Sequence, residues 1–97
     1  MPNIEIHGYL QSHKLLSEEI CQKIIKGLKN TPIANEVVIT VHHTECLDLD
    51  GSISPFFRVL YTEDDPIDTV IAFLHQTFDM GIELQPLAKF IKARSES

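Results

Sequence analysis

Apolar and polar residues alternate strictly at the beginning of the chain, over residues 3–9. Ile4 and Ile6 have one parity, whereas Glu5 and His7 have the other. In a strand, residues of opposite parity point to opposite faces of the sheet. The pattern therefore predicts a strand with one buried face and one polar face.

A helical pattern follows over residues 14–29. Apolar residues recur there at every fourth position and form one broad stripe, which consists of Leu16, Ile20, Ile24 and Leu28. Ser12 precedes this pattern as a plausible N-cap. Pro32 ends it, because the residue before a proline avoids the α region.

Two further strands are predicted at residues 36–43 and 55–62. The first is rich in Val and Ile, and the second contains the run Phe-Phe-Arg-Val-Leu-Tyr. Between them stands Asp50-Gly51, which is a strong signal for a reversal of the chain.

A second helix is predicted to begin at Asp64-Asp65-Pro66, with an acidic cap and a proline in its first turn. Its buried stripe would consist of Ile67, Val70, Ile71, Leu74 and Phe78. Gly81 stands at the C-cap position, and residues 82–84 alternate as a short last strand. From Pro86 onward the chain has two interpretations, a helical turn packed on the sheet or an extended arm reaching a neighbouring subunit, through Leu87, Phe90 and Ile91.

The predicted order is β-α-β followed by β-α-β, within one domain that spans residues 1–97. We expect an α+β fold, a two-layer sandwich in which a four-stranded sheet carries two helices on one face. Nothing else in the chain is available to cover the second face of the sheet. Oligomerisation would cover it.

The charge balance narrows the range of partners. Fourteen acidic residues outnumber eight basic ones, which gives a net charge of −6, and the basic residues form no stripe, so nucleic acid is not an expected partner. No apolar run approaches the roughly 18–20 residues of a membrane span, and the N-terminus lacks a signal-peptide pattern. We therefore expect no membrane partner, a cytoplasmic location, and reduced thiols at Cys21 and Cys46.

Pro2 is the strongest candidate for chemistry. If the initiator methionine is removed, Pro2 becomes an N-terminal secondary amine held at the start of a strand. A free α-amino group titrates near ~7.7–8.0, and burial in an apolar pocket lowers that value. Such an amine is a base suited to moving protons between carbon and oxygen at neutral pH.

Pro2, the two β-α-β units and residues 51–55 before the third strand together resemble the tautomerase superfamily. This family includes oxalocrotonate tautomerases, carboxymethyl-hydroxymuconate isomerases and macrophage migration inhibitory factor. The resemblance implies a tautomerase-like fold and a homotrimer with an amino-terminal proline at each active site. It also implies an isomerase that acts on a small unsaturated or keto acid, and we expect no cofactor.

The anion-binding residues of the family do not transfer. Short members carry arginines near the start of the first helix and of the second strand, where this chain has Lys14 and Glu36 nearby. Cytokine-like members place a lysine just before the second strand, and here Lys29 is only in that vicinity. We therefore predict Arg58 or Lys14 as the substrate carboxylate's partner, from the same or a neighbouring chain. For Arg58, a structural ion pair is the alternative.

The histidines predict no metal site. His42 and His43 are adjacent in a strand, so their side chains point to opposite faces and cannot share one ion. His7 meets one of them only if the first and second strands are neighbours, and Cys46 is a further possible ligand. Because no recognised ligand spacing exists, we interpret these residues as polar histidines at strand ends.

Two non-enzymatic hypotheses remain open. A ferredoxin-like domain has the same β-α-β-β-α-β order and would bind a small ligand without using the terminal amine. A protein that has a tautomerase-like fold but has lost catalytic activity would serve as an oligomeric scaffold, since fold does not determine function.

Overall fold

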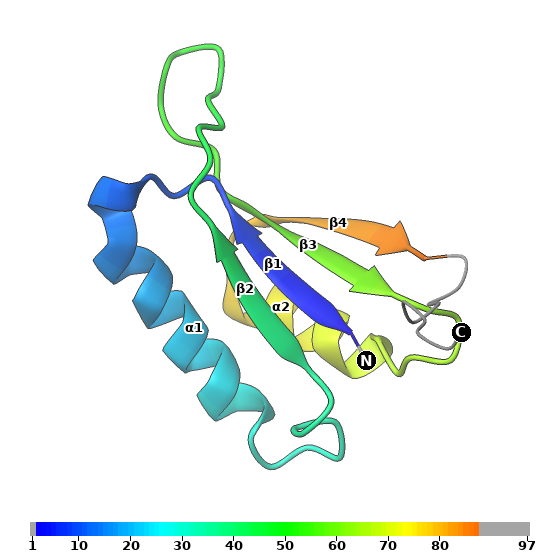
Figure 1. Ribbon diagram of the computed structural model, residues 1–97. Helices are drawn as coiled ribbons and strands as arrows, with labels where there is room; N and C mark the ends of the chain where they lie inside the picture. Colours follow the sequence, from blue (N-terminus) through cyan, green and yellow to red (C-terminus); the bar gives the residue numbers. More distant parts are fainter. Residues whose placement is uncertain (1, 88–97) are drawn as a thin grey trace, which may run out of the picture.

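The computed structural model describes residues 2–87, and its elements follow the predicted order (Figure 1). They are β1 (Asn3–His7), a short 3₁₀ turn (Gln11–His13), α1 (Lys14–Leu28), β2 (Val38–His42), β3 (Phe56–Tyr61), α2 (Asp68–Thr77) and β4 (Gly81–Pro86). The predictions about Met1, Phe90 and Ile91 lie outside the described residues.

The four strands form one mixed sheet in the order β2-β1-β3-β4. β1 pairs in parallel with β2, β3 pairs in parallel with β4, and the central pair β1·β3 is antiparallel. The α+β class with a four-stranded sheet and two helices is therefore confirmed. The ferredoxin-like hypothesis is wrong about strand pairing, because in a split β-α-β unit another strand separates the two that the helix connects.

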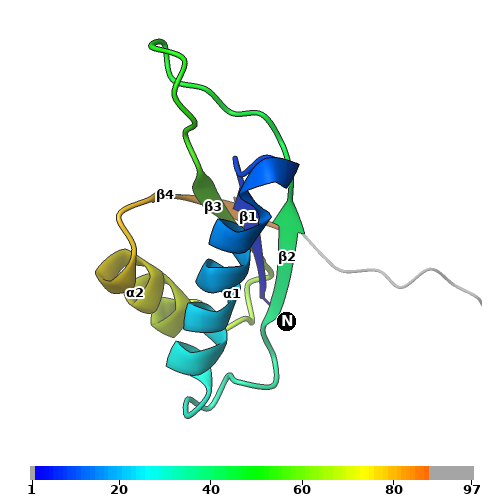
Figure 2. The ribbon, with the colours of Figure 1, turned by 90° about the vertical axis from the view of Figure 1, so that its left-hand side faces the viewer.

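Both helices lie on the same face of the sheet (Figure 2). The hydrophobic core fills the space between the two layers, and its completely buried side chains are Ile4, Ile6, Ile24, Phe57, Val59, Val70 and Leu74. This confirms the predicted division of the first strand into an apolar face and a polar face. Among residues 2–87, no helix covers the polar face, which we call the open face.

The first helix differs in its start from the prediction. Ser12 lies inside the 3₁₀ turn, and His13 is the N-cap residue of α1 without a side-chain capping bond. Ser12 is therefore not the cap, because the chain is already helical at that point. At the other end, the Thr31 hydroxyl donates a hydrogen bond of 2.7 Å to the carbonyl of Leu28.

The second helix begins later than Asp64-Asp65-Pro66 suggests, at Asp68, and Ile67 is its N-cap. Asp65 closes a turn instead, because its carboxylate accepts a 2.7 Å hydrogen bond from the amide of Thr62. α2 ends at Thr77, and Gly81 is the first residue of β4 rather than a C-cap. The turn that Thr62 and Asp65 close thus explains the later start of the helix.

The connection between β2 and β3 projects beyond the sheet as an arm of residues 43–55 (Figure 1). A bridge between Leu47 and Ile53 holds its two sides together, and Gly51 turns the chain with a φ of +88°. Gly8, which follows β1, has a φ of +95° and lies against the backbone of Pro55 at the base of this arm.

Candidate functional site

Pro2 lies directly before β1, and its side chain is fully buried. Its carbonyl accepts a 3.0 Å hydrogen bond from the amide of Val38, which extends the β1·β2 pairing by one residue. Pro2 has the same parity as Ile4, so its ring lies on the helix side of the sheet. The backbone hydrogen bond thus ties Pro2 to the neighbouring strand.

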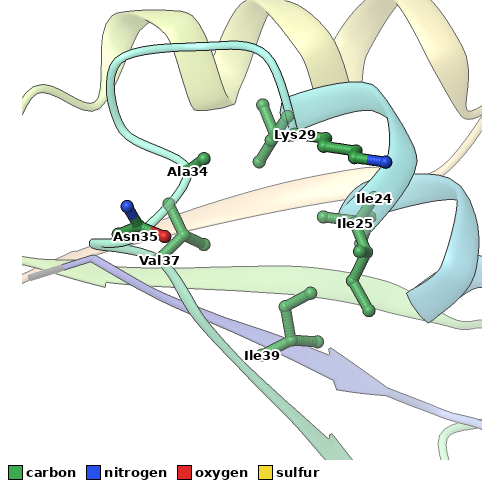
Figure 3. A pocket seen from close by; sticks show the side chains of 8 residues that line it. Ile24, Ile25, Lys29, Ala34, Asn35, Val37 and Ile39 are labelled. Carbon is green, nitrogen blue, oxygen red and sulfur yellow. The ribbon is translucent and has the colours of Figure 1, made fainter.

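A cavity of about 220 Å³ opens between the last turns of α1, the following loop and the start of β2 (Figure 3). Its walls are Ile24, Ile25, Leu28, Lys29, Ala34, Asn35, Val37 and Ile39. Pro2 is not part of the wall, but Val37 adjoins the residue that hydrogen-bonds to Pro2. The cavity and the beginning of β1 are thus at the same end of the sheet.

Two polar side chains, Lys29 and Asn35, stand at this mostly apolar cavity. Lys29 is the C-cap residue of α1 and is exposed, while Asn35 belongs to the loop across the opening (Figure 3). A lysine at this place supplies a positive charge to an anion in the cavity. From the sequence alone, Lys29 was not a predicted anion-binding residue, because it stands nine residues before β2. In the structure the loop folds back and brings it close to that strand.

Lys14 lies at the opposite end of the same helix. α1 has 15 residues, which corresponds to a length of about 22 Å at 1.5 Å per residue. The Lys14 ammonium is 3.9 Å from a carboxylate oxygen of Glu18, and both side chains are exposed. Within one chain, Lys14 is therefore remote from Pro2.

Arg58 lies on the open face, in the centre of β3. Its Nε donates a 2.7 Å hydrogen bond to Glu83, and its Nη1 is 3.6 Å from Glu5. The guanidinium also lies over the ring of Phe56, 5.6 Å from the ring centroid. The hydrogen bond to Glu83 raises the pKa of this guanidinium. The structural ion pair is confirmed, and the sheet separates Arg58 from the ring of Pro2.

The open face also brings together Glu5, His7 and His42. β1 and β2 pair in register, so His7 stands opposite His42, and the two imidazole rings stack with centroids 4.6 Å apart. The Nε2 atom of His7 is 2.7 Å from Glu5 Oε1. His43 points away from this group, and its Nδ1 is 3.0 Å from the carbonyl of Tyr9. The opposite orientation of the two adjacent histidines is confirmed.

The two cysteines are free and take no part in either group. Burial raises the pKa of the Cys21 thiol, and the carboxylate of Glu18 raises it further. The thiolate is the nucleophilic form, so Cys21 is poorly suited to covalent chemistry. Cys46 contacts the hydroxyl of Thr44 at 3.7 Å and does not join the histidines.

None of the helices in the described part of the chain has the length and apolar character needed to cross a membrane. No family model matches this chain, and neither a curated protein nor a solved structure matches it.

Proposed function

We propose that this protein is a tautomerase-like isomerase in which the secondary amine of Pro2, exposed by removal of Met1, is the general base. The observation that carries this proposal is the position of Pro2, which is fully buried at the start of a central strand. A cavity with a cationic residue opens at the same end of the sheet. An amine kept out of water favours its neutral, basic form.

The strand arrangement supports a tautomerase-like fold. Each β-α-β unit keeps its two parallel strands as direct neighbours, and the two units meet at the antiparallel pair β1·β3. The resemblance to the tautomerase superfamily implies two such units in one chain. The strand order argues against the ferredoxin-like alternative, because that fold requires a different pairing of the strands.

The proposed reaction needs no oxidant or second substrate. The neutral amine of Pro2 takes a proton from a carbon or an enol hydroxyl, and the ammonium then returns it to another atom of the same molecule. Negative charge develops on the substrate oxygen during the transfer, and a nearby cation stabilises it. Lys29 is the candidate within the same chain, whereas Arg58 or Lys14 would act from a neighbouring subunit.

A homotrimer forms part of this proposal. Among residues 2–87, no helix covers the open face (Figure 2). A second copy of the chain packed on this face would cover it. Light scattering after size exclusion should give three times the chain mass. A stable monomer would contradict the assembly.

A test of the terminal amine is to block it without changing any side chain. One protein is the natural chain, checked by intact mass for loss of Met1, and the other keeps a single glycine before Pro2 after tag cleavage. Ketonisation of an aryl enolpyruvate, followed by ultraviolet absorbance, should slow by about 10²-fold or more in the extended protein, because a general base contributes ~10²–10⁴-fold and an amide nitrogen has no basicity.

The matched control carries the same glycine at the C-terminus and should keep the natural rate. Equal rates in the natural and N-terminally extended proteins, or Met1 retained in the natural one, would overturn the proposal.

One observation favours the scaffold hypothesis as a second candidate. Pro2 does not line the cavity, so in this conformation a ligand in the cavity does not touch its ring. A protein that assembles but shows no ketonisation with Met1 removed would support the scaffold function.

A further inference from the structure

The open face contains a group of three potential metal ligands that the proposed isomerase does not use. One ring nitrogen each of His7 and His42 and a carboxylate oxygen of Glu5 all lie within 4.8 Å of one another. We propose that these three side chains bind one divalent first-row transition ion of the zinc type per chain. Two imidazoles and one carboxylate are a donor set that such ions occupy in proteins, with a position left for water.

The strand pairing fixes two of the ligands in place. His7 and His42 are partners in the parallel ladder of β1 and β2, and Glu5 stands two residues before His7 on the same face. A rigid sheet therefore supplies all three donors, and no loop has to close over the ion. The convergence of His7 with one of the adjacent histidines was foreseen only for the case that the first two strands are neighbours, because the spacing of 35 residues between His7 and His42 matches no common ligand motif.

The donor atoms already lie near the separations that one ion requires, but the imidazole rings must turn, and His7 also stacks on Phe56 with ring centroids 4.9 Å apart. Nε2 of His7 and of His42 lie 2.7 and 3.7 Å from the Glu5 carboxylate oxygens. Bonds of about 2.0–2.1 Å in tetrahedral geometry place donor atoms about 3.3 Å apart. The stacked rings must turn so that both planes point at the ion, and the Thr40 hydroxyl, 2.9 Å from His42 Nε2, must release that nitrogen.

The local charges suit a cation. Arg58 is the positive neighbour of Glu5, at 3.6 Å, but its closer partner is Glu83, at 2.7 Å. Glu83 therefore balances the positive charge of the guanidinium. The negative charge of Glu5 is then available to attract the ion.

The site also has a path of entry. The side chain of His42 is 38% exposed, whereas those of His7 and Glu5 are 10% and 13% exposed. In the single chain, an ion would thus be largely enclosed by protein and reached from the open face past His42. The sheet lies between this group and the ring of Pro2, so metal binding and proton transfer can be tested separately.

The experiment measures Zn²⁺ alone by titration calorimetry at pH 7.5, in the full chain with Cys21→Ser and Cys46→Ser to remove thiol ligands. We expect one equivalent per chain. Glu5→Gln and His42→Ala should each weaken binding at least about tenfold, since even outer partners of a metal site change affinity by ~10–100-fold.

The matched control is His75→Ala, which removes an exposed histidine from the last turn of α2 and should leave affinity unchanged. Circular dichroism checks that each variant is folded, and the visible absorption of bound Co²⁺ gives a second readout of the ligand set. Absence of stoichiometric binding, or a Co²⁺ spectrum and Zn²⁺ affinity that His42→Ala and Glu5→Gln leave unchanged, would overturn the proposal.

Discussion

Replacement of Pro2 by alanine is expected to lower kcat/KM for enol ketonisation by about 10²-fold or more, out of the ~10²–10⁴ that a general base contributes. Alanine permits the same removal of Met1, so the variant still presents a terminal amine. That amine is primary and rotates freely, whereas the proline ring fixes its nitrogen at the start of β1. The fall in kcat/KM would therefore measure how much the fixed position of the amine contributes to the rate.

The control for this experiment is Pro32→Ala. Pro32 is an exposed proline in the loop after α1, so its removal tests for a general effect of losing a proline. It should leave kcat/KM within about twofold. If Pro2→Ala were as active as the natural protein, the proline ring would have no role in positioning the terminal amine.

Replacement of Gly8 by alanine is expected to destabilise the fold by about 3 kcal/mol or more. Gly8 has a φ of +95°, a conformation that costs an L residue about 1–2 kcal/mol. In addition, a Cβ atom would lie 2.5 Å from the Cα of Pro55, well inside van der Waals contact. That neighbour is backbone, so neither strand can relax without disturbing the β1·β3 pairing. Urea unfolding measures the change.

The natural comparison is Gly51→Ala in the projecting arm. Gly51 has a similar φ of +88°, but no atom lies within 4 Å of the position that its Cβ would take. This variant has only the conformational cost, partly offset by reduced freedom of the unfolded chain, so about 1 kcal/mol is expected. Equal losses in the two variants would show that the contact with Pro55 contributes nothing.

Much of the fold was predictable because parity and periodicity are local properties. The alternation around Ile4 and Ile6 fixes which side of β1 is buried, and the opposite orientation of His42 and His43 follows from the same rule. Helix ends were less predictable. Asp65 is as suitable for a turn as for a cap, and the structure uses it in a turn with Thr62.

The candidate site was harder to predict, because its parts meet only in the folded sheet. Two cations, Arg58 and Lys14, were chosen from the sequence for their residue type and neighbourhood. In the structure Glu83 engages Arg58, and the length of α1 separates Lys14 from Pro2. Lys29 comes close to β2 only because the chain turns back after Leu28. The encounter of His7 with His42 likewise depends on strand order, which residue patterns do not specify.

The antiparallel pairing of β1 with β3 gives the chain an internal twofold relationship between its halves. Under this rotation the residue before β1 corresponds to the residue before β3, and both are prolines, Pro2 and Pro55. Pro55 sits in mid-chain, so its nitrogen is always acylated and can never carry a proton. On the function proposed above, the chain therefore has one terminal amine for the two corresponding positions. The second position is free to serve structure alone, as its close contact with Gly8 indicates.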